Sequence, residues 1–106
     1  MANDKDFKIK NGLTVDSDTL VVDAANSRVG IGTTPSKTLH VYRNDTNTDN
    51  QITVEQAGTG DATIGFLKTG VFNWMTGIDN TDNKYKISGS GAGLALRHLT
   101  ALEGSV

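Results

Sequence analysis

Histidines, carboxylates and hydroxyls are the side chains that could do chemistry in this chain of 106 residues. The two histidines are His40 and His98, and neither lies in a recognisable catalytic order with Ser, Asp or Glu. Triad members meet in space and not along the chain, so spacing alone does not exclude a triad. His40 lies between Leu39 and Val41 in a strand-like run, which favours an outward or interface side chain. We expect no enzyme.

Residues 45–49 read Asp-Thr-Asn-Thr-Asp and place oxygen-bearing side chains at alternate positions, like the first half of a calcium-binding loop. An EF-hand also needs glycine at its sixth position and glutamate at its twelfth, where this chain has Asn50 and Gln56. A solvated turn is therefore favoured, with weak cation binding in a fibre as the alternative. Residues 79–82 have the same interpretation. The chain has no cysteine for a disulfide or thiolate site, and we expect neither metal nor cofactor.

Two glycine-rich stretches, residues 57–61 and 88–93, could be taken for phosphate-binding loops. Neither ends in the Lys-Ser or Lys-Thr pair of a P-loop, and neither precedes a clear helix, so both are interpreted as turns. Trp74 is the one tryptophan, and a sugar could stack on it if it were exposed. Because Phe72 and Met75 lie beside it, a core position is favoured for Trp74.

Charge and hydropathy exclude two classes of partner. The net charge is −2 and the ten basic residues are scattered, which argues against a nucleic-acid surface. No hydrophobic run approaches the length that spans a bilayer, so we expect no membrane insertion.

The composition predicts an all-β chain with many turns. Glu55 and Glu103 are the two glutamates among 12 acidic residues, whereas Asp, Asn, Gly and Thr together make 45 of the 106 residues. The first three favour turns and Thr favours strands and turns. Strands are predicted at residues 7–10, 13–15, in both arms of a hairpin over 19–32, and at 38–42, 51–55, 62–68, 71–76 and 84–88.

The run Val-Gly-Ile-Gly at residues 29–32 gives a strand with one bulky face and one bare face. Glycine at alternate positions lets another backbone approach closely. This geometry favours a strand stacked against a neighbour in an elongated assembly over a strand beside a catalytic pocket.

These residues carry a resemblance to a known family. Residues 20–23, 29–36 and 39–41, which read Leu-Val-Val-Asp, Val-Gly-Ile-Gly-Thr-Thr-Pro-Ser and Leu-His-Val, resemble the repeat unit of tail fibres and related virion appendage proteins of tailed bacteriophages. Residues 1–15 resemble the start of such proteins in marine, cyanophage-like viruses.

A second repeat unit of the same family is resembled by three further parts of the chain. These are residues 52–66, the pair Asn73-Trp74 and residues 77–87. The resemblance implies a virion location, a homotrimeric and intertwined fibre, other virion proteins as partners, and a role in host attachment. It covers roughly residues 1–90, and the end of the chain departs from the family pattern.

The domain organisation follows from these patterns. Residues 1–43 are expected to hold the N-terminal strands and the first repeat unit, and residues 44–50 a polar loop. Residues 51–88 are expected to form the second β unit. Residues 89–106 are expected to be a flexible Gly/Ser link and a C-terminal segment.

A small β chain with few bulky residues cannot easily cover its own strand edges. Leu, Ile, Val and Phe make up 25 of the 106 residues, enough to fold but with a thin core. Unpaired edges invite association, and closure around a symmetry axis lets each copy cover its neighbours. The residues expected to be buried near a trimer axis are Leu20, Val22, Val29, Ile31, Ile52, Val54, Ile64 and Phe66.

Two functions are consistent with these observations. The first is a non-enzymatic structural component of a phage tail fibre or virion appendage. The alternative is a lectin-like module in which Trp74 and the loops at 44–50 and 79–83, with Asp79 and Asp82, contact host surface polysaccharide. A glycan-cleaving enzyme ranks last, because it needs paired carboxylates that face one cleft.

Overall fold

The computed structural model describes residues 6–89, which form seven β-strands and no helix. The predicted all-β class is confirmed for this part of the chain. The chain divides into two units, Met1–Gln51 and Ile52–Val106, and each is described by itself. The expectations for residues 90–106, including His98 and Glu103, lie outside the described residues.

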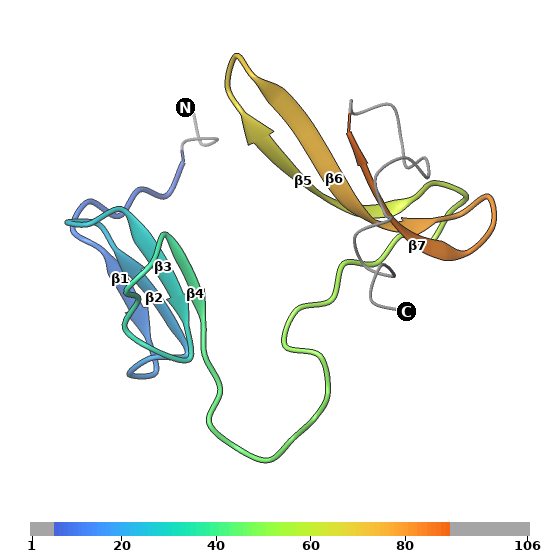
Figure 1. The fold of residues 1–106 in the computed structure, drawn as a ribbon. Helices are drawn as coiled ribbons and strands as arrows, with labels where there is room; N and C mark the ends of the chain where they lie inside the picture. The colour runs from blue at the N-terminus through green and yellow to red at the C-terminus, as the bar shows by residue number, and fades with distance from the viewer. Residues whose placement is uncertain (1–5, 90–106) are drawn as a thin grey trace, which may run out of the picture. The chain divides into compact units, whose positions relative to one another are not determined.

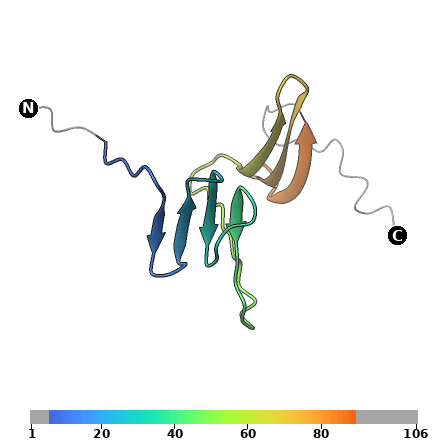
Figure 2. The same ribbon diagram turned by 90° about the vertical axis from the view of Figure 1, so that its left-hand side faces the viewer.

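A four-stranded sheet makes up the first unit (Figure 1). Its strands lie side by side in chain order, and Figure 2 shows them as neighbouring arrows. The first three strands are antiparallel, whereas the fourth is parallel to the third. The strands are β1 (Leu13–Val15), β2 (Leu20–Asp23), β3 (Arg28–Ile31) and β4 (Leu39–Val41).

The hairpin predicted over residues 19–32 is present as β2 and β3. Its turn is held by the Asp23 carboxylate, which accepts hydrogen bonds from the Asn26 backbone N–H at 3.2 Å and from the Asn26 side-chain amide at 2.9 Å. The side-chain bond from Asn26 is the main reason why the pKa of Asp23 is lowered. The polar turn therefore stabilises the hairpin through a charged acceptor.

The link between β3 and β4, residues 32–38, crosses one face of the first sheet. Pro35 in this link is buried, and a Cβ added to Gly30 would lie 2.2 Å from the Thr33 carbonyl oxygen. The bare position in β3 thus admits a closely approaching backbone, as its sequence predicted. The approaching backbone is the chain's own link and not that of a neighbouring copy.

Val21 is the buried hydrophobic side chain of the described residues, with 9% of its surface exposed. It lies opposite Gly30 in the register of β2 and β3, on the face that the 32–38 link crosses. A short link can cover only a small area of the sheet. The covered core of the first unit is therefore a cluster of Val21, Gly30 and Pro35.

The second unit is a three-stranded antiparallel meander of β5 (Ala62–Lys68), β6 (Phe72–Asp79) and β7 (Lys84–Gly89). The hairpin predicted across Gly70 joins β5 to β6. The predicted turn at residues 80–83 joins β6 to β7.

Two predicted strands are wrong for this structure: residues 7–10 and 51–55 belong to no strand. Both segments have the alternating pattern of a strand, and the side chains of Phe7, Ile52 and Val54 are exposed. A strand needs a partner ladder as well as a pattern, and within residues 6–89 these segments have none.

Gly77 should be irreplaceable in the second sheet. Its φ is +157°, and an added Cβ would lie 2.0 Å from the Ala62 carbonyl oxygen. Gly77→Ala should therefore lower the free energy of unfolding by about 1–3 kcal/mol or more, measured by urea unfolding with Trp74 fluorescence. Gly65→Ala is the matched control, because its Cβ would meet nothing closer than 3.7 Å. Equal stability of the two variants would contradict this description of the sheet.

Candidate functional site

One face of the first sheet carries aliphatic side chains alone. The register places Leu13, Val22, Val29 and Leu39 across the four strands on the same face. Their strand neighbours two residues away complete the set, which we call the aliphatic face. It consists of Leu13, Val15, Leu20, Val22, Val29, Ile31, Leu39 and Val41.

This aliphatic face is open in the single chain. Exposed fractions reach 36% for Leu13 and 60% for Leu39, and the central residues are half-buried. The four trimer-core candidates of the first unit, Leu20, Val22, Val29 and Ile31, all lie on it. The buried set predicted from the sequence did not include the other four members of the face. These four, Leu13, Val15, Leu39 and Val41, show the same alternation.

The opposite face of the first sheet is closed by the 32–38 link. His40 belongs to this face, and its Nδ1 accepts a hydrogen bond from the Ser36 backbone N–H at 3.1 Å. The Ser36 hydroxyl lies 3.3 Å from the same nitrogen. The His40 ring therefore holds the link against the sheet.

The second sheet also has an apolar face, which we call the aromatic face. Phe66 lies opposite Trp74 in the register, and Ile78 lies opposite both Ala62 and Tyr85. The face consists of Ala62, Ile64, Phe66, Phe72, Trp74, Ile78, Tyr85 and Ile87, with Thr76 at its centre and Lys68 at the end of β5. The Thr76 hydroxyl is satisfied within the face by hydrogen bonds to the Tyr85 hydroxyl and the Lys86 carbonyl oxygen.

Trp74 is half-buried at the end of the aromatic face near the β5–β6 turn. Its ring packs edge-on against Phe72, with ring centroids 5.6 Å apart. The two rings and Phe66, which is 61% exposed, line an open hollow with Gly65, Leu67, Lys68 and Val71. Trp74 is thus part of an apolar surface that the single chain covers only in part.

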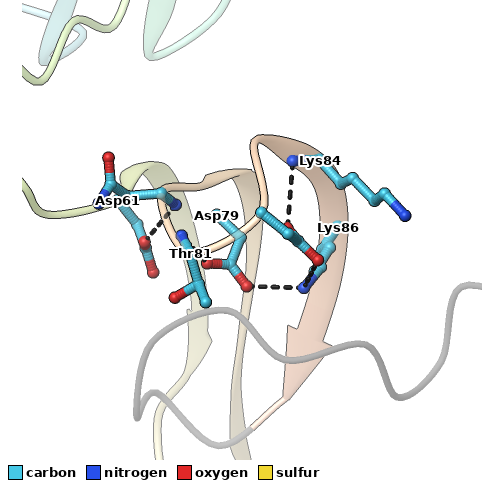
Figure 3. A network of polar contacts seen from close by, with 7 residues as sticks. Asp61, Asp79, Thr81, Lys84 and Lys86 are labelled. Atoms are coloured by element: carbon cyan, nitrogen blue, oxygen red, sulfur yellow. Dashed lines mark hydrogen bonds and ion pairs between the residues drawn. The ribbon is translucent and has the colours of Figure 1, made fainter.

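Asp79 and Asp82 are held by one lysine. The Lys86 Nζ lies 2.7 Å from Asp79 Oδ2 and 3.0 Å from Asp82 Oδ2 (Figure 3). Asp79 Oδ1 also accepts the Thr81 backbone N–H at 2.7 Å. Asp79 and Lys86 are 5% and 8% exposed. These contacts close the β6–β7 turn around a buried ion pair.

The ion pair shifts both partners toward their charged forms. The hydrogen bond from Lys86 is the main cause of the lowered pKa of Asp79, and the bond to Asp79 is the main cause of the raised pKa of Lys86. Asp79 lies at an odd-numbered position of β6 and Trp74 at an even-numbered one, so they occupy opposite faces of the sheet. The structure does not bring the predicted glycan-binding residues together.

Arg43 satisfies the polar loop that resembles half of a calcium site. Its guanidinium donates to the carbonyl oxygens of Asn47 at 3.0 Å and Asp49 at 2.7 Å, and lies 3.4 Å from Asp45 Oδ1. Asp45 and Asn47 each accept a backbone N–H two residues ahead at 2.8 Å. A cation of the chain itself thus occupies the position where these oxygens converge. Residues 6–89 hold no cluster of three metal-ligating side chains.

Comparisons with protein-family models, with curated proteins and with solved structures give no match. Within the described part of the chain, no helix is long and apolar enough to cross a membrane. The candidate functional surface rests on the geometry alone, namely on the exposed apolar side chains of the aliphatic face and the aromatic face.

Acid should weaken the second unit through Asp79. Because the pKa of Asp79 is lowered on folding, its stabilising effect is complete above the unfolded-state pKa near 4 and is lost as pH falls from there through the lowered folded-state pKa. The urea midpoint followed by Trp74 fluorescence should fall between pH 5 and pH 3, and Asp79→Asn should flatten this dependence while lowering the midpoint at pH 7. Asp23→Asn, in the other unit, should leave the Trp74 profile unchanged. An acid dependence in Asp79→Asn as steep as in the parent would refute the assignment.

Proposed function

We propose that this chain is a non-enzymatic structural subunit that assembles with copies of itself, through its uncovered apolar faces, into a virion appendage of the tail-fibre type. The observation that carries the proposal is the aliphatic face. All eight of its side chains are Leu, Val or Ile, and they cover one side of a four-stranded sheet.

The size of the uncovered surface supports assembly. Full burial of one aliphatic side chain contributes about 1.5–3 kcal/mol. Covering the half-exposed side chains of the aliphatic face would therefore contribute on the order of 1 kcal/mol each, a total similar to the net stability of a small domain. An exposed apolar face of this kind marks an interaction surface.

A three-fold assembly is the form we propose. Closed symmetry lets the same face of each copy turn toward a common axis, so that three copies cover one another. The number three comes from the resemblance of residues 29–36 and their neighbours to phage fibre repeats. Attachment to a host, and contact with other virion proteins, are parts of the proposal that come from the same resemblance.

The glycan-binding alternative has less support. Asp79 and Asp82 pair with Lys86, and Trp74 lies on the other face of the sheet from Asp79. Trp74 also belongs to an apolar face that self-assembly would cover. The hollow beside Trp74 is lined mainly by apolar residues, with Lys68 as the charged side chain among them.

A charge on the aliphatic face should prevent assembly. Val15 and Thr14 are adjacent residues of the edge strand β1, both exposed in the single chain, and their side chains lie on opposite faces. Val15→Asp should reduce the mass measured by light scattering toward that of one chain, because assembly would bury an unpaired carboxylate. Thr14→Asp should keep the parent's mass.

The matched pair separates assembly from folding. Circular dichroism should show the same β content for both variants, since neither position is buried in the single chain. If Val15→Asp and Thr14→Asp assemble equally well, or if the parent protein is itself a monomer, the proposed function is wrong.

A further inference from the structure

The outer edge of β5 is an unprotected strand edge. Within the described residues β5 pairs with β6 alone, so its other side is free. It is seven residues long and carries one charged residue, Lys68, at its end. Natural proteins normally shorten, charge or cover such an edge, because its free N–H and C=O groups template pairing with another chain.

The other sheet edges are better protected. The edge strands of the first unit, β1 and β4, have three residues each. The far edge of the second sheet, β7, carries Lys84 and Lys86. The edge of β5 is thus the one in residues 6–89 that is both long and nearly uncharged.

The segment at residues 51–56 is a strand sequence without a partner. It reads Gln-Ile-Thr-Val-Glu-Gln, with β-branched residues at positions 52–54. Within the described residues it joins no sheet, and Ile52 and Val54 are 60% and 47% exposed. The chain therefore presents both an open edge and an unpaired segment able to cover one.

We infer that residues 51–56 of one copy add as a strand to the outer edge of β5 in a second copy. The inference rests on the proposed self-assembly and names one of its contacts. Main-chain hydrogen bonds would supply the pairing and alternate side chains its specificity, as in other cases of strand addition.

The side-chain pattern of the segment matches that of the edge. With Ile52 and Val54 placed on the aromatic face, they would lie beside Ile64 and Phe66, which are exposed there. Thr53 and Glu55 would then share the more polar face with Thr63. The added strand would enlarge the apolar face to four strands and would place Ile52, Val54, Ile64 and Phe66 on one surface.

Two hydrogen bonds hold the link between this segment and β5 of its own chain. Gln56 Oε1 accepts the Gly58 backbone N–H at 2.8 Å, which bends the chain at the end of the segment. Asp61 Oδ1 accepts the Asn80 backbone N–H at 2.9 Å and so ties the start of β5 to the β6–β7 turn (Figure 3). With the link in this conformation, residues 51–56 join no sheet within the described part of the chain.

Disulfide trapping tests the inference on a clean background, because the chain has no cysteine. The double variants Thr53→Cys/Thr63→Cys and Thr53→Cys/Gly65→Cys place thiols on one face at two registers of the pairing. After mild oxidation of the full chain, at least one of them should run as covalent dimers and trimers on a denaturing, non-reducing gel. Thr53→Cys/Lys84→Cys, with the second thiol on β7, is the matched control and should stay mostly unlinked.

Hydrogen exchange gives a second measurement without substitutions. Amides in the peptide covering residues 51–56 should exchange at least about tenfold more slowly in the assembled parent than in the Val15→Asp variant.

A disulfide formed within one chain would overturn the inference. Absence of covalent oligomers together with fast exchange, in a parent that light scattering shows to be an oligomer, would overturn it and leave the proposed function standing. A monomeric parent would overturn both the inference and the proposed function.

Discussion

A thin sheet has two faces, and each must be covered by other groups or carry polar side chains that water can solvate. The first unit meets this constraint on one side only. There the 32–38 link lies over Gly30 and Val21, and His40 holds the link through Ser36. On the other side the eight aliphatic side chains are exposed or half-buried in the single chain, and no link comparable to residues 32–38 crosses them within the described residues. Assembly with other copies would resolve this imbalance, and the proposed function follows from it.

The second unit shows the same constraint in another form. Its most buried side chains are polar, with Asp79, Lys86 and Ser88 all below 9% exposed, while Phe66 and Tyr85 on the aromatic face are exposed. A buried ion pair is weak evidence for stability, because desolvation offsets much of the attraction. The pair instead fixes the β6–β7 turn and the register of the meander. A meander that buries polar groups and exposes aromatic ones is incomplete as a solitary domain.

Local pattern predicted much of the fold. Alternation identified the hairpin of β2 and β3 and the hairpin across Gly70, and placed Leu20, Val22, Val29 and Ile31 on one face, because the two-residue period of a strand is a property of its own sequence.

Which strands pair over longer distances is not visible in the sequence of a single strand. The parallel placement of β4 beside β3 is therefore an observation of the structure alone, and so is the absence of a ladder at residues 51–55. Asp79 and Lys86 are seven residues apart and meet across the β6–β7 turn, so their ion pair depends on the pairing of two strands and not on the pattern of one. Arg43 directly precedes the polar loop at residues 44–50. Its positive charge at this position was the signal in the sequence that a guanidinium could bind the oxygens of this loop.

The central claim is that the open faces are covered by sister chains, so folding and association should be linked. The most direct test is the thermal midpoint of the unmodified protein measured over a wide range of concentration, with the mass in solution measured alongside. Since partner binding stabilises the folded state by mass action, the midpoint should rise with concentration, and the mass should be three times that of the 11.2 kDa chain. A midpoint independent of concentration, in a protein that stays a folded monomer, would contradict the account.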